Sequence, residues 1–185
     1  LIIKQRLEEE ITLKEQMVAW IKDYFAKNGD ENTKALIGIS GGKDSTVVAA
    51  ACVAALGKDR VVGVMMPNGV QTDINDSKRV CEFLGIKNYE VNIKGAYDAL
   101  TQEITAKTAG EATPQFKTNT PSRLRMATLY GVAAIIGNCR ISNNGNKSER
   151  LMGYFTIWGD GAGDFAPLAN LYVSDVVRLG IELGL

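Results

Sequence analysis

The sequence predicts a doubly wound α/β fold, in which helices cover both faces of a parallel sheet. Short apolar runs alternate with helical patterns along the chain, and this order is typical of parallel strands joined by crossover helices. The apolar runs are continuous, as in strands that are buried on both faces. The chain has 185 residues, 45% of them hydrophobic, so it can bury such a core without a disulfide or metal staple.

The first half of the chain gives a regular order of elements. An amphipathic helix with apolar residues at Met17, Ile21 and Phe25 is expected to end near Lys27, before an Asn-Gly-Asp stop. Apolar runs and helical spacing then alternate, and glycines follow both later helices. The expected elements are strand 35–39, helix 44–56, strand 61–66, helix 76–84 and strand 89–93.

The second half is less regular. Segment 108–120 is polar and is expected to form a loop or lid. Thr120 as N-cap and Pro121 at the first helical position predict a helix that runs toward Gly137. A fourth strand is then expected at 140–142, followed by a segment rich in Gly, Asn and Asp, and finally by a helix capped by Ser174.

Composition excludes several classes of function. Histidine is absent, which rules out a Ser-His-Asp triad, a histidine base and a His-ligated zinc. The 21 basic and 21 acidic side chains are interleaved, so we expect neither nucleic acid nor a membrane surface as partner. The longest apolar run, 47–56, is too short for a membrane span. Cys52, Cys81 and Cys139 are expected to be buried free thiols, which suits a cytoplasmic location.

A glycine-rich segment, GISGGKDS at 38–45, joins the first expected strand to its helix. At that position a parallel sheet presents backbone N–H groups and a helix N-terminus to a phosphate. Gly41 and Gly42 would let the backbone approach phosphate oxygens closely, and Ser40 and Ser45 can donate hydroxyl hydrogen bonds. The segment therefore predicts an anion site.

Asp44, in the same segment, indicates a metal. A carboxylate beside a polyphosphate is repelled unless a divalent cation lies between them, and Mg²⁺ binds one or two carboxylates together with phosphate oxygens. A Walker A loop is excluded, because three residues rather than four separate Gly38 from Gly42, and Asp44 follows Lys43. The alternative is a tight turn followed by ordinary helix caps.

The glycine-rich segment resembles the SGGxDS loop of the N-type ATP pyrophosphatases, which activate a carboxylate or carbonyl oxygen as an adenylate. Later segments resemble, in order, the motifs of ammonia-dependent NAD synthetases: MPNGVQTD (66–73), NTPSRLRM (119–126), GNKSE (145–149), GYFTIWGD (153–160), GDFAPL (163–168) and LYVSDV (171–176). This resemblance covers nearly the whole chain. It implies an adenine nucleotide alpha hydrolase-like fold in a single domain over residues 1–185.

The resemblance also implies a reaction, in which deamido-NAD is amidated to NAD by ammonia at the expense of ATP. The nicotinate carboxylate attacks the α-phosphorus of ATP, and ammonia then displaces AMP from the adenylate. Both nucleophiles are substrates, so alignment and cations suffice and a chain without histidine can perform it. A homodimer, with the dinucleotide near the subunit interface, is implied as well.

Site residues follow from the same resemblance. Mg²⁺ would bind Asp44 and Glu149, deamido-NAD would bind Arg123 and Asp164, and catalysis would involve Asp44, Glu149 and Asp164. Without the order of the motifs, these residues have simpler interpretations: solvated helix arginines for Arg123 and Arg125, a helix-start carboxylate for Glu149, and turn formers for Asp160 and Asp164. ATP would bind Gly38, Ser40, Gly41, Gly42, Lys43, Asp44, Ser45, Gln71 and Asn144.

Three positions depart from the family pattern. Asn144 stands where the family often has Thr, and Ile157 and Val173 stand where it commonly has Lys. Asn can still form hydrogen bonds with ATP, but neither apolar residue can neutralise a phosphate. Lys43 is a candidate substitute.

Two alternatives stay open. One is another adenylating amidotransferase with the same loop, including a tRNA-modifying relative, which the neutral charge disfavours. The other is a nucleotide-binding module without catalysis, suggested by the missing lysines. The chain starts at Leu1 and stops at Leu185, so we expect that both ends are cut and that the family's C-terminal segment is missing. Glutamine use would require an attached glutaminase domain, so ammonia is the expected donor.

Overall fold

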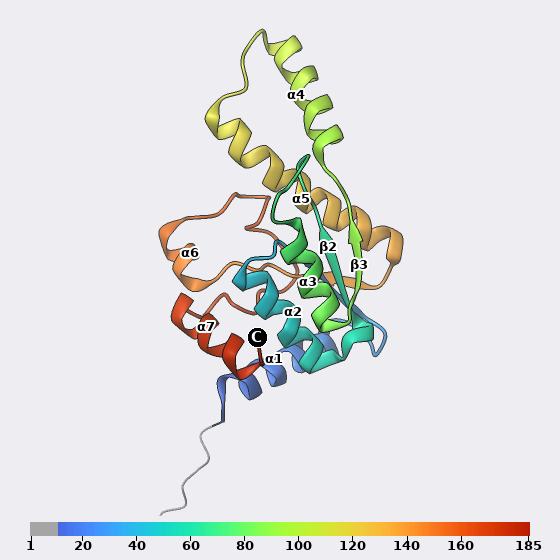
Figure 1. Cartoon of the computed structure of the whole chain (residues 1–185), viewed down its shortest axis with the longest axis vertical. Coiled ribbons are helices and arrows are strands. Elements are labelled where there is room, and N and C mark those ends of the chain that lie inside the picture. Colours follow the sequence, from blue (N-terminus) through green and yellow to red (C-terminus); the bar gives the residue numbers. More distant parts are fainter. Residues whose placement is uncertain (1–10) are drawn as a thin grey trace, which may run out of the picture.

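A four-stranded parallel sheet forms the centre of the computed structural model, which describes residues 11–185 (Figure 1). Neighbouring strands lie in the order β3-β2-β1-β4, and every pairing is parallel. The expected fold class is therefore confirmed, and the expected strands are confirmed with ends shifted by at most three residues. Their bounds are β1 Lys34–Gly38, β2 Val61–Met65, β3 Lys87–Glu90 and β4 Cys139–Ile141.

The strand order places a topological switch point beside β1. The chain moves from β1 to β2 and β3 on one side, and β4 then pairs with β1 on the other side. The connections at the carboxyl ends of β1 and β4 therefore diverge and leave a crevice between them. This crevice is where open α/β sheets bind their ligands, and the glycine-rich segment follows β1 directly.

One face of the sheet is covered by four helices (Figure 1). The strands contribute side chains such as Ile37 and Met65 to this core, and α2 contributes the fully buried Val48 and Cys52. The small residues of α2 allow it to lie close to the sheet, and α1 and α7 pack against it. The helices are α1 Leu13–Asn28, α2 Lys43–Leu56, α3 Ile74–Leu84 and α7 Val173–Glu182, with a short 3-10 helix, η1, at Lys58–Arg60.

The opposite face is covered by α5, Pro114–Ile136. Leu36 and Val64 point to this side and pack with Met126 and Leu129 of α5. Alternate residues of β1 and β2 therefore enter different cores, as the two-residue period of a strand requires. Burial on both sides explains why these strands are continuously apolar in the sequence.

The expected loop over 108–120 is wrong. Helix α4 extends over Lys94–Thr108 and α5 begins at Pro114, so only residues 109–113 connect them. Thr113 caps α5 by accepting a hydrogen bond from the Phe116 backbone N–H (3.1 Å). The expected cap at Thr120 and Pro121 therefore lies inside the helix, because Thr113 and Pro114 supply the same signal seven residues earlier.

Helix α4 and the first turns of α5 project beyond the sheet (Figure 1). No residue of α4 is buried, and the two helices contact each other through Tyr97 and Phe116, whose ring centres lie 6.1 Å apart. Tyr97, Leu100 and Ile104 recur at helical spacing along α4. This signal was available in the sequence, and the helix was nevertheless not predicted.

The last part of the chain also differs from expectation. Helix α6, Lys147–Met152, lies in the Gly-, Asn- and Asp-rich segment where no helix was predicted. Helix α7 begins at Val173 with Tyr172 as its cap residue, so the prediction of a cap at Ser174 is wrong. The reason is Asp175, whose carboxylate accepts the Tyr172 backbone N–H at 3.0 Å and fixes the helix start there.

Two of the three cysteines are buried as expected. Burial raises the pKa of the Cys52 and Cys81 thiols above the ordinary value. Cys139 is only partly buried, because it lies on the edge strand β4. Within residues 11–185, no helix combines the length and apolarity that a membrane crossing needs.

Candidate active site

The glycine-rich segment turns sharply between β1 and α2. Gly41 has a φ of +81°, which an L-residue adopts only with strain. A Cβ atom there would lie 3.1 Å from the backbone nitrogen of Ser77, so the turn also lies tightly against the first turn of α3. Glycine at this position therefore serves both backbone conformation and close packing.

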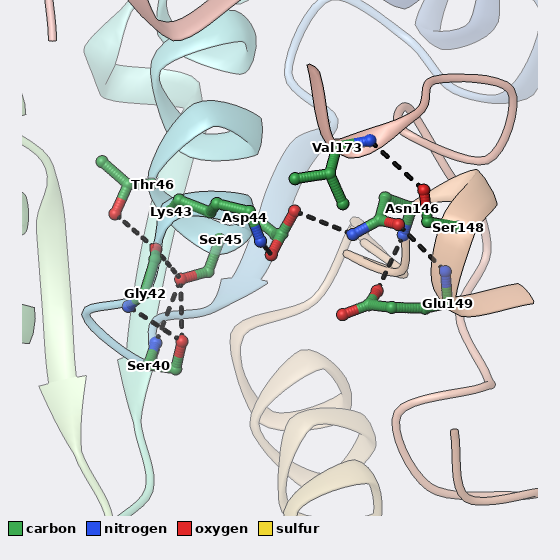
Figure 2. A network of polar contacts seen from close by, with 10 residues as sticks. All are labelled: Ser40, Gly42, Lys43, Asp44, Ser45, Thr46, Asn146, Ser148, Glu149 and Val173. Carbon is green, nitrogen blue, oxygen red and sulfur yellow. Dashed lines mark hydrogen bonds and ion pairs between the residues drawn. The ribbon is translucent and has the colours of Figure 1, made fainter. Parts of the chain in front are cut away.

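Two hydroxyl groups hold the turn in place (Figure 2). The Oγ atoms of Ser40 and Ser45 lie 3.1 Å apart, Ser40 Oγ accepts the Gly42 backbone N–H, and Ser45 Oγ donates to the Gly42 carbonyl. Helix α2 begins at Lys43 with no side-chain cap. Because first-turn N–H groups of a helix lack intrahelical partners, the uncapped end of α2 can accept an anion.

A cleft of about 550 Å³ opens at the switch point, above the carboxyl ends of β1 and β4. Many of the predicted site residues meet there, although they lie more than 100 positions apart in the chain. The predicted residues that line it are Gly38, Ser40, Gly42, Asp44, Ser45, Gln71, Asn144 and Glu149. The structure adds Asp73, Ser122, Arg125, Met126 and Asp160 to this wall.

The two carboxylates predicted to bind a metal share a contact residue, Asn146 (Figure 2). Asn146 Nδ2 donates to Asp44 Oδ1 at 3.2 Å, and the Asn146 backbone N–H donates to Glu149 Oε2 at 3.0 Å. Asn146 is fully buried and also caps α6, since its Oδ1 accepts the Glu149 backbone N–H. Both acids are therefore oriented toward one side of the cleft.

This donor set fits Mg²⁺ that arrives with a nucleotide. Among residues 11–185, no three acidic, cysteine or histidine side chains converge as a metal cage. Mg²⁺ needs no such cage, because it commonly uses one or two carboxylates and fills its shell with phosphate oxygens and water. Asp44 and Glu149 supply two carboxylates at the cleft.

Lys43 lies beside the cleft and not in its wall. Its Nζ atom forms an ion pair with Asp44 Oδ2 at 2.7 Å, and 46% of its side chain is exposed. Such a pair on a partly exposed surface contributes little to stability. The lysine therefore occupies a carboxylate oxygen that a bound cation would require.

Asp164 is placed outside the cleft wall. Its Oδ2 accepts the Ile141 backbone N–H at 2.7 Å, which ties the segment after α6 to the end of β4. Burial raises the pKa of nearby Tyr130, and the negative charge of Asp164 raises it further. Arg123 is also outside the cleft: it is exposed, and its Nε donates to the carbonyl of Ile157 at 3.1 Å.

Two residues at the site, Asp160 and Asn146, received no role from the sequence. Asp160 Oδ1 accepts hydrogen bonds from Ser122 Oγ (2.7 Å) and from the Thr156 backbone N–H (2.9 Å), so it joins α5 to the loop after α6. Asn146 precedes Glu149 by three positions, and this capping-box spacing was an available signal. The sequence did not show which side of α5 faces the cleft, because the rotation of this helix about its axis was unknown.

The three departures from the family pattern can now be located. Asn144 donates from Nδ2 to the Gly38 carbonyl at 3.0 Å and accepts from Ser142 Oγ at 2.8 Å, so it links the ends of β1 and β4. Val173 lies at the start of α7, beside Ser148 (Figure 2). Ile157 is 61% exposed. Neither apolar side chain lines the cleft.

Comparison with known proteins decides the family. A family model described as NAD synthase matches residues 13–185. The chain belongs to the NAD synthase family. The NH(3)-dependent NAD(+) synthetase of Pyrococcus furiosus is 36% identical over 170 residues, which make up 92% of this chain and 63% of that protein. The chain thus spans somewhat less than two thirds of the length of this relative.

Solved structures of an NAD synthetase and of an NMN synthetase share the fold. The NH3-dependent NAD synthetase of Campylobacter jejuni superimposes with a TM-score of 0.82 at 31% identity, over 93% of this chain and 72% of that one. NMN synthetase of Francisella tularensis superimposes with a TM-score of 0.80 at 35% identity, over 92% of this chain and 69% of that one. The doubly wound α/β architecture is therefore that of the NAD synthase family.

Proposed function

We propose that this NAD synthase domain amidates the nicotinate carboxylate of deamido-NAD with ammonia, with ATP as co-substrate and Mg²⁺ as cofactor. The observation that carries the proposal is the meeting of the glycine-rich segment with Asp44 and Glu149 in one cleft. A polyphosphate on the loop and two carboxylates nearby are complementary only through a divalent cation. This arrangement suits ATP activation and requires no nucleophilic side chain.

The reaction has two steps with both nucleophiles supplied by substrates. A carboxylate oxygen of deamido-NAD attacks the α-phosphorus of ATP, the bond to the bridging oxygen breaks, and pyrophosphate leaves. Ammonia then attacks the acyl carbon of the adenylate, loses a proton, and AMP leaves with the former carboxylate oxygen. Alignment of the two substrates is the main contribution that the chain has to make.

Each part of the cleft has a defined task in this reaction. The turn at Gly41 and the uncapped N-terminus of α2 bind phosphate oxygens. Asp44 and Glu149 would hold Mg²⁺, which neutralises charge on the leaving pyrophosphate. Asn146 keeps both carboxylates oriented, because it donates a hydrogen bond to each of them. Lys43 would have to leave Asp44 for this carboxylate to hold the cation, and its charge would then be available to the phosphates.

Deamido-NAD would extend beyond this cleft. Arg123 and Asp164 lie outside the wall, where they would contact deamido-NAD near a subunit interface. Exposed apolar side chains on α5, Tyr130 at 44% and Ile135 at 88%, support a homodimer that covers this helix. The free thiols fit a cytoplasmic location.

An isotope experiment tests the proposal. The protein is mixed with ATP, Mg²⁺, ammonium and deamido-NAD labelled with heavy oxygen in its carboxylate. We expect NAD and AMP, with label transferred to the AMP phosphate. Formation of ADP, or of AMP without label, would contradict adenylation of the carboxylate. ATP binding without turnover would favour a nucleotide-binding module instead.

The choice of acceptor needs its own comparison. Nicotinate mononucleotide is the informative competitor, since a structural relative at 35% identity is an NMN synthetase. We expect a higher kcat/KM with the dinucleotide. The opposite preference would identify the domain as another amidating member that uses the same loop.

A further inference from the structure

Two arginines of α5, Arg123 and Arg125, differ sharply in their surroundings. Residues two positions apart on a helix point in directions roughly 200° apart. Arg123 is accordingly exposed and bonded to the carbonyl of Ile157, whereas Arg125 is partly buried and lines the cleft. Only the second guanidinium therefore faces the space where the substrates react.

Arg125 is fixed at one end and free at the other. Its Nε atom donates to the carbonyl of Met66, at the end of β2, at 3.0 Å. Its two Nη groups form no hydrogen bond with any other residue between 11 and 185. Burial lowers the pKa of Arg125, and the negative charge of Asp160 partly opposes that shift. A guanidinium held by one nitrogen presents its remaining donors as a fixed fork.

Asp160 is the carboxylate whose negative charge acts on Arg125. Asp160 is bound to Ser122 and to the Thr156 backbone, and it forms no ion pair with Arg125 within the described chain. A partly desolvated cation without a counter-ion is unfavourable until an anion binds beside it. The Arg125 guanidinium is therefore available to bind an anion in the cleft.

Acidic side chains outnumber basic ones in the wall of the cleft. Of the described residues that line the wall, Arg125 is the one basic side chain, and it faces four carboxylates, of Asp44, Asp73, Glu149 and Asp160. Lysine is absent at positions 157 and 173, which carry Ile and Val. An anionic substrate that enters this cleft therefore meets one basic side chain in the described wall, with Lys43 beside that wall and paired with Asp44.

We propose that Arg125 binds a reacting oxyanion through its two Nη groups, and so sets the position of the substrate in the cleft. The oxyanion is either the α-phosphate of ATP or the nicotinate carboxylate, since both match the bidentate geometry of a guanidinium. This inference rests on the proposed function, because that function supplies the two oxyanions.

Equilibrium binding tests the role without requiring turnover. Affinities of wild type, Arg125→Gln and Arg125→Lys are measured by calorimetry for ATP with Mg²⁺, for deamido-NAD, and for NAD, which carries an amide in place of the carboxylate. Arg79→Gln is the control, because it removes the same charge from a side chain that is 81% exposed on α3. Thermal unfolding verifies that each variant is folded.

We expect Arg125→Gln to weaken one ligand by roughly 10- to 100-fold, as for loss of a charged hydrogen bond. Weaker ATP binding identifies the phosphate, and weaker deamido-NAD binding with unchanged NAD binding identifies the carboxylate. The affinity of Arg125→Lys for that ligand should fall almost as far, since lysine lacks the planar fork of donors. The affinities of Arg79→Gln should stay within about threefold of wild type.

Wild-type affinity of both Arg125 variants for all three ligands would overturn the role. An equal loss in Arg79→Gln would also overturn it, because the effect would then be general charge. A binding defect of Arg125→Gln in a protein that makes no NAD would support the oxyanion site and refute only the proposed reaction.

Discussion

Replacement of Gly41 by Ala should lower both the stability of the fold and its affinity for ATP. The residue has a φ of +81°, and an added Cβ would lie 3.1 Å from Ser77 N and 3.2 Å from the Asp76 Cβ. The backbone conformation costs about 1–2 kcal/mol for alanine, and overpacking costs about 1–3 kcal/mol more. We expect a total loss of roughly 2–5 kcal/mol, which lowers Tm by about 5–15 °C in a protein of this size.

The same substitution should also weaken ATP binding by about 10-fold or more, equivalent to about 1.4 kcal/mol, because the turn must move away from Ser77 and into the cleft. Thermal unfolding and calorimetry measure the two effects. Gly57→Ala is the matched control at the other end of α2, with a φ of +82° and no atom within 4 Å of the added Cβ. It should lower Tm by a smaller amount and leave ATP affinity unchanged. ATP affinity within twofold of wild type in Gly41→Ala would refute this reasoning.

Three further predictions concern side chains. Asp44→Ala should abolish Mg²⁺-dependent AMP formation while the circular dichroism spectrum stays native, because this carboxylate serves the metal and not the core; unchanged turnover would refute its role. Asn146→Ala should lower the free energy of unfolding by about 1–2 kcal/mol in a denaturant titration, because a buried helix cap is lost. Thr12→Ala, which removes an exposed cap, is the control and should lower it less. Equal losses would contradict a special role for the buried contacts of Asn146. Asn138 hydrogen bonds lower the pKa of Asp30, so native stability holds above the unfolded pKa and declines as pH falls through the lower folded value. Asn138→Gly, which tolerates the φ of +48°, should flatten the dependence of Tm on pH in the acid range, and an unaltered dependence would contradict this assignment.

The first half of the fold could be predicted because each element carries its own local signals. Continuous apolar runs mark β1 and β2, and Gly57 and Gly85 mark the helix ends that the structure shows. Helix α4 was missed although Tyr97, Leu100 and Ile104 recur at helical spacing, because it has no capping side chain at its start and no glycine directly at its end. The start of α5 was misplaced because two Thr-Pro pairs, at 113–114 and 120–121, give the same signal.

The candidate site was predictable only in part. The glycine-rich segment is local, so its turn could be inferred from spacing, and the proposed role of Asp44 at a metal rests on charge alone. The contact between Asn146 and Asp44 joins residues 102 positions apart, and only the fold brings them together. The distinction between Arg123 and Arg125 depends on the rotation of α5 relative to the sheet, which a sequence pattern with little amphipathicity leaves undefined.

The proposed metal site can be located in a crystal structure with ATP and with Mn²⁺ in place of Mg²⁺, because anomalous scattering identifies the ion without assumption about the ligand. We expect an ion between Asp44 and Glu149, with Lys43 displaced from Asp44 and phosphate oxygens on the turn at Gly41. An ion bound elsewhere, with the turn empty and both acids still held only by Asn146, would contradict it.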